Sequence, residues 1–338
     1  MSDLLIGLLS VLVATNQPAA MSNLVVRKTG VVLNIPDKND PVEQAYQKLL
    51  ADDDAAQAEV DGWIKADQAL GDKGTDVETA TMRVRVKQRL DRVKQAYDEF
   101  LQRHPDHARA RLAYGSFLND IQEEGAAQVQ WEKARELDPS NPAAWNNLAN
   151  WYAHNSPVTK SFEYYGKAIE LNPNESVYYE NLALTVYMFR QDATNYFKIT
   201  EQQVFEKAMA LYRKALALDP ENFILATEYA QSYYGFKPRQ IGEEAADRKA
   251  RQKHFEDAMA AWGQAYKVAR DDIEREGVYL HFARLQINAG RFDAARINLS
   301  LVTNAMYLQT KERLAKKLAG LENKPAATNA PPAPGATP

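Results

Sequence analysis

The sequence predicts an all-α protein, a solenoid of helical hairpins with an α-helical N-terminal lead-in. Glycine and proline occur only 15 times each in 338 residues, which leaves long stretches without a helix breaker. Pro105, Pro139 and Pro173 recur at intervals of thirty-four residues, and Pro220 follows after thirty-four residues plus thirteen more. A fixed interval of this length is typical of stacked helical repeats.

The composition of the chain argues against some kinds of binding partner and excludes cysteine-based chemistry. The chain carries 41 Lys and Arg against 45 Asp and Glu, a net charge of -4, with both signs well mixed. Such a balance produces no overall field that would attract nucleic acid or an anionic membrane. The absence of cysteine excludes disulfides, thiolate metal sites and cysteine nucleophiles.

Residues 1–39 combine an apolar segment with a valine-rich stretch, residues 21–39, that is expected to be extended. The apolar run from Leu4 to Ala14 (residues 4–14) is too short to span a bilayer. Its length fits a signal peptide, but Asp3 stands where such peptides carry positive charge. Two alternatives stay open. In the first, residues 1–20 act as a signal peptide, and the protein is exported or periplasmic. In the second, the run is a docking helix that allows membrane association, and the protein is cytoplasmic.

Residues 40–107 are predicted to form a helical lead-in. Asp40 is suited to cap a first helix that begins at Pro41, where the missing N–H of proline costs nothing. The acidic triplet Asp52 to Asp54 is expected to open a second helix, because the helix dipole favours anions at an N-terminus. A helix start is favoured over a metal site because no second acidic cluster follows at ligand spacing.

The last helix of the lead-in contains the one strongly basic stretch of the chain. A loop at residues 71–74 precedes it, Thr75 and Glu78 form a capping pair, and the helix is expected to end near Gln102. The cations between residues 83 and 94 are Arg83, Arg85, Lys87, Arg89, Arg92 and Lys94. They form either a solvated helix face or a surface that contacts an acidic partner or phosphate.

Two segments of thirty-four residues share a motif of small and large side chains. In residues 142–175 its members are Trp145, Leu148, Ala149, Tyr152, Tyr165, Ala168 and Pro173. In residues 108–141 they are Gly115, Leu118, Ala127, Trp131, Ala134 and Pro139. Both segments resemble the tetratricopeptide repeat family, in which small residues lie where two helices cross closely. The resemblance implies a right-handed α-solenoid.

Five such repeats are expected in residues 108–304, with insertions near 191–203 and 236–253. Tyr196, Phe197 and Phe236 in these insertions either extend a partner surface or only accompany lengthened helices, and both interpretations stay open. Residues 305–323 are expected to form a capping helix with one solvent-exposed face. The tail at 324–338, mostly alanine and proline, is expected to be disordered.

The resemblance also implies where a partner binds. First helices of neighbouring hairpins in the family line a concave groove that holds an extended peptide or partner protein. The residues at groove-facing positions here are Arg109, Leu112, Ser116, Asn119, Asp120, Asn146, Asn150, His154, Glu180, Leu184, Tyr187, Thr227, Gln231 and Tyr234. A clamp for a terminal carboxylate, which some members use, is not expected, because Asn146, Ile224 and Glu228 replace its cations.

The sequence shows no pattern that is typical of a catalytic site. No nucleophile elbow, phosphate loop or dinucleotide-binding glycine pattern occurs, and the five histidines lack metal-ligand spacing. His104 and His107, which flank a repeat turn, are expected to be solvent-exposed. We therefore expect no catalytic residue, cofactor, metal or small-molecule substrate, and a protein that is not an enzyme.

Three functions follow from these expectations. The favoured one is a non-catalytic scaffold or adapter that binds a peptide or partner protein in the groove of the repeats. The alternative is an envelope-associated assembly or structural scaffold, anchored or exported through the N-terminal apolar segment. The third is a regulator that contacts nucleic acid through the basic helix at residues 83–94, although nucleic acid is not the expected partner.

Overall fold

The computed structural model describes residues 39–70, 76–236 and 242–323, and in these ranges the chain is helical with no strand. The all-α prediction is confirmed. Within the same ranges, no helix combines the length and apolar character needed to cross a membrane. The chain divides into two compact units after Ser140, and each unit is described by itself. The predictions for residues 1–38, for the loop with Thr75 and for the C-terminal tail concern residues outside the described ranges.

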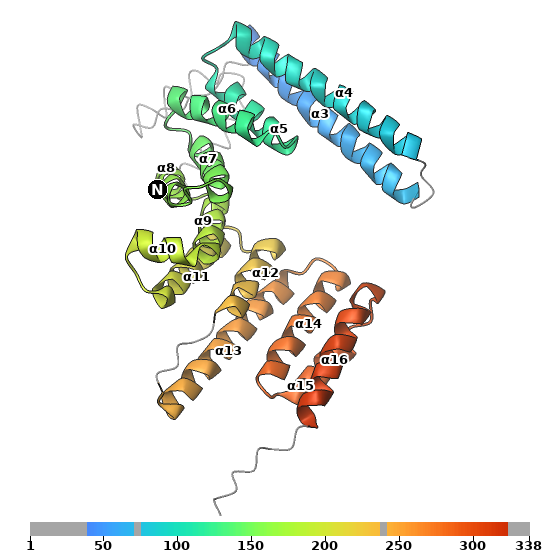
Figure 1. Cartoon of the computed structure of the whole chain (residues 1–338), viewed down its shortest axis with the longest axis vertical. Helices are drawn as coiled ribbons and strands as arrows, with labels where there is room; N and C mark the ends of the chain where they lie inside the picture. Colours follow the sequence, from blue (N-terminus) through green and yellow to red (C-terminus); the bar gives the residue numbers. More distant parts are fainter. Residues whose placement is uncertain (1–38, 71–75, 237–241, 324–338) are drawn as a thin grey trace, which may run out of the picture. The chain divides into compact units, whose positions relative to one another are not determined.

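The first unit consists of two helical hairpins (Figure 1). Its helices are α3 (Pro41–Leu70), α4 (Asp76–Arg103), α5 (Ala108–Asp120) and α6 (Glu124–Leu137). Helix α3 begins as expected, because the Asp40 carboxylate accepts a hydrogen bond of 2.9 Å from the Val42 N–H. The α3/α4 hairpin forms the lead-in, and α5/α6 forms the first repeat.

The helix expected to open at Asp52 does not exist as a separate element, so this prediction is wrong. Helix α3 continues through the triplet, because residues 42–61 contain no glycine or proline that would end it. The carboxylates bind the neighbouring helix instead. The hydroxyl of Tyr97 on α4 donates a 2.7 Å hydrogen bond to buried Asp53, and Arg89 pairs with Asp52 at 2.9 Å.

Most of the basic stretch on α4 contacts groups inside the first unit. The contacts are Arg85 over the Trp63 ring at 3.9 Å, Lys87 with Asp91 at 2.6 Å, Arg89 with Asp52 and with Glu59 at 3.1 Å, and Lys94 with Glu123 at 2.6 Å. The Lys87 pair lies within α4, but Arg85, Arg89 and Lys94 contact residues outside this helix, so the stretch is more than a solvated helix face.

Both histidines before α5 are half-buried, so the exposure expected for them is wrong. The Nδ1 atom of His107 caps α5 by accepting a 3.0 Å hydrogen bond from the Ala110 N–H, and its ring lies 4.7 Å from the ring of Tyr46. The ring of His104 lies 4.8 Å from that of Phe100. Burial lowers the pKa of His107, which favours the neutral ring that the cap requires.

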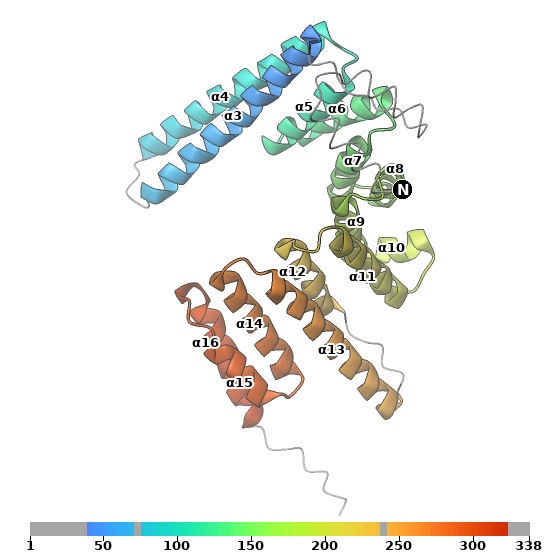
Figure 2. The same ribbon diagram turned by 180° about the vertical axis from the view of Figure 1, so that it is seen from behind.

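The second unit is an array of four hairpins followed by one helix (Figures 1 and 2). The hairpins pair α7 (Pro142–His154) with α8 (Thr159–Leu171), α9 (Ser176–Met188) with α11 (Glu201–Leu218), α12 (Phe223–Ser232) with α13 (Glu244–Val268), and α14 (Asp272–Asn288) with α15 (Phe292–Ser300). Helix α16 (Leu308–Glu322) packs on α14 and α15 and buries Leu314 and Leu318 there. The hairpins follow the units of the tetratricopeptide pattern, so the predicted fold class is confirmed.

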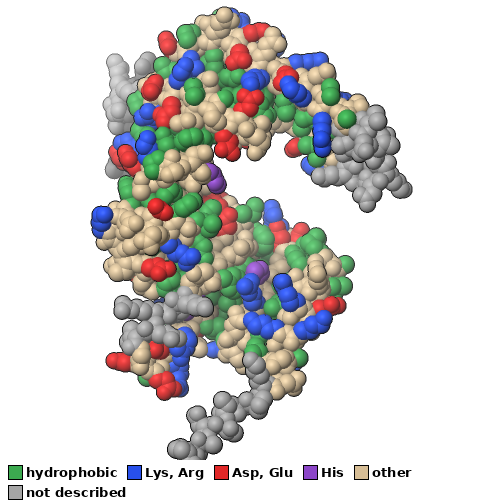
Figure 3. Space-filling model, in the orientation of Figure 1, with side chains coloured by type: hydrophobic (Ala, Val, Ile, Leu, Met, Phe, Trp, Pro, Cys, Tyr) green, Lys and Arg blue, Asp and Glu red, His purple; other side chains and the backbone are tan. Residues whose placement is uncertain are grey.

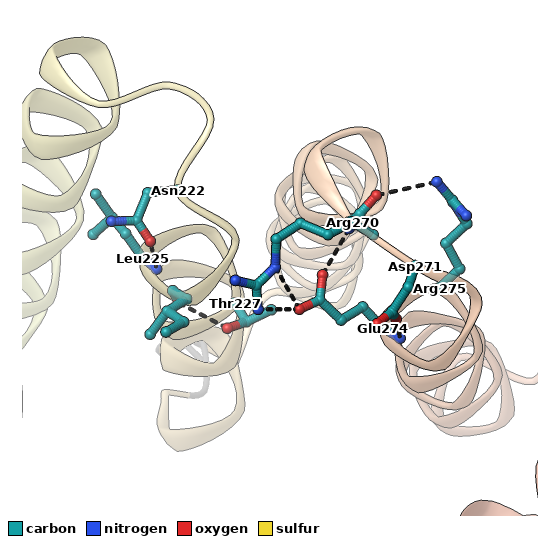
Figure 4. Close-up of polar contacts among 9 residues, drawn as sticks. Asn222, Leu225, Thr227, Arg270, Asp271, Glu274 and Arg275 are labelled. Atoms are coloured by element: carbon teal, nitrogen blue, oxygen red, sulfur yellow. Dashed lines mark hydrogen bonds and ion pairs between the residues drawn. The ribbon is translucent and has the colours of Figure 1, made fainter. Parts of the chain in front are cut away.

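Polar caps fix where three of the first helices begin. Asn141 accepts from the Ala143 N–H at 3.0 Å, Asn222 from the Leu225 N–H at 3.0 Å, and Asp271 from the Glu274 N–H at 2.8 Å. Figure 4 shows the caps at α12 and α14, together with the Arg270 guanidinium that binds the Glu274 carboxylate. Each cap satisfies an N–H group that has no partner within its own helix.

The two insertions differ in structure. The first forms a short helix, α10 (Arg190–Phe197), whose Phe197 ring lies 5.4 Å from that of Phe162 on α8. In the second, the described residues from Glu244 lengthen α13, and Phe236 before them stacks on Phe205 at 4.0 Å. A lengthened helix therefore accounts for part of the second insertion, while the first adds a separate helix on which Tyr196 stays exposed.

The crossing of α5 and α6 supplies a test of the repeat geometry. A Cβ atom on Gly115 would lie 2.4 Å from the Trp131 ring, so Gly115→Ala should destabilise the protein by about 1–3 kcal/mol. Gly125 on α6 has no atom within 4 Å of such a Cβ, so Gly125→Ala should be neutral or stabilise by about 0.5 kcal/mol. Urea denaturation of both variants measures the difference, and equal stabilities would contradict the packing described.

Candidate functional site

The first helices of the second unit lie next to one another, joined by side chains at predicted groove positions. Between α7 and α9, the amide of Asn181 donates a 3.0 Å hydrogen bond to the Asn146 side chain. Between α9 and the 3₁₀ turn that follows α12, the Tyr187 hydroxyl covers Gly235 so closely that a Cβ there would lie 1.8 Å from it. Arg190 also donates a 2.7 Å hydrogen bond to the Gly235 carbonyl.

A polar aromatic cluster joins the 3₁₀ turn after α12 (Tyr233–Gly235) to α14 and α13. The hydroxyl of Tyr234 lies 3.0 Å from Nδ1 of His281, whose ring stacks on Trp262 at 3.8 Å. The Arg284 guanidinium lies 4.4 Å over the Tyr234 ring. Burial, with help from the Arg284 charge, lowers the pKa of His281 to about 4. At neutral pH His281 is therefore uncharged, and Arg284 is the cation at this end of the face.

Two half-buried carboxylates lie where α9 and α12 meet. Burial and the negative charges of Glu228 and Asp219 raise the pKa of Glu180 to about 7. Burial also raises the pKa of Glu228, and its Oε2 atom is buried without a hydrogen-bond partner among the described residues. Glu180 is therefore only partly ionised at neutral pH, and neither carboxyl group forms an ion pair among the described residues.

Exposed apolar side chains follow the same stripe of α9 and α12. Leu184 is 40% exposed, Met188 63% and Ile224 60%, and Val177 is also exposed. On α9 these residues are separated by seven and four positions, the spacing that keeps side chains on one face of a helix. Large exposed apolar side chains at neighbouring positions are typical of an interaction surface.

The predicted groove residues of the second unit divide into those used inside the fold and those left exposed. Asn146 is buried, Asn150 accepts a 2.5 Å hydrogen bond from the Tyr165 hydroxyl, and Thr227 donates to the Ile224 carbonyl at 2.7 Å. Leu184, Gln231 and His154 are exposed. The structure therefore brings the residues of α7, α9 and α12 onto one face, with part of the set serving to join the helices.

The five residues predicted in the first repeat, which include exposed Asp120, lie in the first unit, on α5. Arg109 pairs with Glu43 on α3 at 2.8 Å and lies 4.7 Å over the Tyr46 ring, so a lead-in helix already occupies its guanidinium. Ser116 donates to the Leu112 carbonyl at 3.3 Å, and Asn119 is exposed. Their part in binding stays a prediction.

Several residues of this face are absent from the predicted groove set. Met188 takes the thirteenth position of its repeat, and His281 and Arg284 on α14 take the positions that Glu228 and Gln231 occupy on α12. A strict count of repeat positions would have found Met188 and Arg284, but not His281, because the equivalent Glu228 is not a predicted groove position either. No group of His, Asp or Glu that could hold a metal ion occurs in the part of the chain that the structure describes.

No family model and no curated protein matches the chain. It is similar to the solved structure of YrrB, described as a TPR protein with an unusual peptide-binding site, with 11% identity, 67% of this chain and 98% of that chain covered, and a TM-score of 0.47. For pilF of Pseudomonas aeruginosa the identity is 15%, the coverage 79% and 98%, and the TM-score 0.47. For PilW, described as a type IV pilus biogenesis factor, the identity is 14%, 74% of this chain and 100% of that chain are covered, and the TM-score is 0.46. Likeness at this level carries no information on function.

The raised pKa of Glu180 predicts how stability depends on pH. The folded state holds this proton more tightly than the unfolded state, in which the pKa is near 4.5, so the contribution of Glu180 to the free energy of unfolding should fall as pH rises from about 4.5 to 7, while the lowered pKa of His281 acts in the opposite direction. Glu180→Gln removes this fall and should be the more stable protein at pH 8, by on the order of 1 kcal/mol after allowance for solvent screening.

Urea denaturation at pH 5 and pH 8 measures this effect. Glu163→Gln, at an exposed position on α8, is the matched control and should follow the wild-type protein at both pH values. The free energy of unfolding could differ between pH 5 and pH 8 by the same amount in the wild-type protein and in Glu180→Gln. That result would show that Glu180 is solvated like an ordinary surface carboxylate.

Proposed function

We propose that the face formed by α7, α9, α12 and α14 binds an extended peptide segment of a partner protein, so that the chain acts as an interaction scaffold. The observation that carries the proposal is the exposed apolar stripe of Leu184, Met188 and Ile224 beside the carboxylates of Glu180 and Glu228. Apolar side chains at these positions are not needed to hold the helices together.

The residues on this face suggest how such a segment is held. Apolar side chains of the partner pack on Leu184, Met188 and Ile224, and each one that becomes fully buried contributes about 1.5–3 kcal/mol. The exposed amide of Gln231 is free to turn toward the peptide backbone, and Tyr234 supplies a flat ring that the fold already holds in place. A held ring loses little conformational entropy when the partner binds.

Charge gives the segment a preferred direction. Glu180 and Glu228 favour a lysine or arginine of the partner near α9 and α12, and Arg284 favours a carboxylate near α14. In Figure 3, Lys and Arg side chains gather over α14, and apolar side chains interrupt the polar surface toward α9. A segment with a basic and an acidic end separated by apolar residues fits this order.

The other functions considered stay predictions. An envelope-associated scaffold depends on residues 4–14, which lie outside the described ranges. Nucleic-acid binding through residues 83–94 depends on cations of which Arg85, Lys87, Arg89 and Lys94 contact groups of the first unit. Neither has an observation in its favour comparable to the apolar stripe.

A selection from a peptide library tests the proposal and does not require an identified partner. Peptides selected on the immobilised full chain should be enriched in apolar residues with a flanking lysine or arginine. Leu184→Asp and Met188→Asp should weaken their binding about ten-fold or more, since each places a charge against an apolar side chain. Isothermal titration calorimetry measures the affinities.

The control is Ile297→Asp on α15, where the wild-type side chain is 63% exposed and lies outside this face. It should leave the affinities within about two-fold of the wild-type values. Peptides whose binding depends on Ile297 and not on Leu184 or Met188 would place the partner surface elsewhere.

A further inference from the structure

The lengthened part of α13 forms one wall of a cleft that shares Tyr234 with the partner-binding face but contains none of the residues of the apolar stripe. Residues 244–253 add nearly three turns to this helix, which runs beyond the end of α12 (Figures 1 and 2). Together with Tyr234 and Phe236 and the C-terminal end of α14, they enclose a cleft of about 510 Å³. Side-chain recognition sites commonly have volumes of this size.

Cations surround the cleft. Arg248 and Arg251 line it, and no carboxylate is among the lining residues. Two more cations contact the lining side chains, because Arg291 lies 4.3 Å over the Phe255 ring and Lys317 donates a 2.6 Å hydrogen bond to Asn288. The cleft is therefore positively charged in a chain whose net charge is -4.

The two lining arginines differ in what already holds them. Arg248 pairs with Glu244 one turn earlier, at 2.6 Å, and both side chains of the pair are largely exposed. Arg251 is exposed, and among the residues that the structure describes it has no ion-pair or hydrogen-bond partner. Its guanidinium is the group with the most hydrogen-bonding capacity left for a ligand.

The floor of the cleft is apolar. Phe236, Phe255 and Leu285 line it, and Phe236 is held in place by its stacking on Phe205 at 4.0 Å. Gln252 and Asn288 at its rim supply amide groups of the kind that bind a peptide backbone. The cleft thus combines an apolar pocket with a cationic rim.

We propose that this cleft is a second docking site, which binds an acidic peptide segment of a partner protein. Carboxylates of the segment bind the guanidinium groups of Arg251 and Arg248, where planar bidentate pairing is strong. An aromatic or aliphatic side chain between those carboxylates enters the pocket against Phe236 and Phe255. This cleft binds carboxylates, whereas Glu180 and Glu228 favour a basic residue. The two sites therefore select different segments.

The chemistry of the cleft favours a peptide over a nucleic acid. Binding of a phosphate backbone draws on a track of cations along several nucleotides. Here the cations are confined to one cleft, and the adjacent surface of α13 carries the carboxylates of Glu244, Glu256 and Asp257. A short acidic segment needs only the charge that the cleft contains.

Fluorescence anisotropy with the full chain tests the proposal. The probe is a fluorescein-labelled peptide with a central phenylalanine flanked by two glutamates on each side, and the matched probe has glutamine in place of every glutamate. The acidic probe should bind saturably and the glutamine probe about ten-fold more weakly. Added salt should weaken binding of the acidic probe.

Two variants of equal charge change locate the site. Arg251→Ser should weaken binding of the acidic probe about ten-fold. Lys249→Ser, exposed on the same helix and outside the cleft, should change it by less than about two-fold. Circular dichroism melting of both variants should match the wild-type protein, because both side chains are exposed.

Three outcomes would overturn the proposal. The first is the absence of saturable binding by the wild-type chain. The second is an equal loss in Arg251→Ser and Lys249→Ser, which would show attraction by the general field of α13. The third is displacement of the probe by a thymidine oligonucleotide at a lower concentration than by unlabelled acidic peptide, which would show a phosphate site. None of these outcomes bears on the groove formed by α9 and α12.

Discussion

In four of the hairpins a large ring from the second helix packs against a small residue of the first helix, and the array depends on this contact. Trp131 fills the space beside Gly115, and buried Tyr165, Tyr212 and Trp262 take the same repeat position in later hairpins. The corresponding small residues, Ala149, Ala183 and Ala230, are fully buried. Because the ring comes from the second helix, one side of the first helix is covered and the other is left for solvent or a partner. The cost is visible in the indole N–H groups of Trp131 and Trp262, which are buried without a hydrogen-bond partner among the described residues.

The exposed side of the first helices in the second unit follows from this arrangement. Side chains at its borders, such as Asn181 and Tyr234, are used to join one hairpin to the next. The residues between them are available to contact a partner. Here the apolar stripe of α9 lies beside the carboxylates of Glu180 and Glu228. Burying those carboxylates raises their pKa and costs stability at neutral pH, a cost that a bound cation would offset. The extension of α13 adds a surface of opposite charge that the repeat itself does not need.

The hairpins could be predicted from the sequence because the proline interval and the small and aromatic positions reflect local packing. The groove positions on α9 and α12 follow from the same pattern, and their part in binding stays a prediction. The helical lead-in could be predicted too, but the role of Asp53 inside one continuous helix could not, since it depends on Tyr97, which lies forty-four positions later in the chain. The cap formed by His107 and the stacking of His281 on Trp262 likewise depend on contacts that the local pattern does not contain. The cleft beside α13 was missed because its walls come from three helices, and no single stretch of sequence contains the pattern.

Hydroxyl-radical footprinting of the full chain, with and without a peptide selected on it, tests the partner-binding face most directly. Met188, Leu184 and Tyr234 are reactive side chains on that face, and Met306, 70% exposed before α16, is an internal reference. The account predicts that the peptide protects Met188, Leu184 and Tyr234 from oxidation and leaves Met306 unchanged. Unchanged oxidation of Met188 and Leu184 at saturating peptide would contradict it, because the partner would then bind away from the first helices.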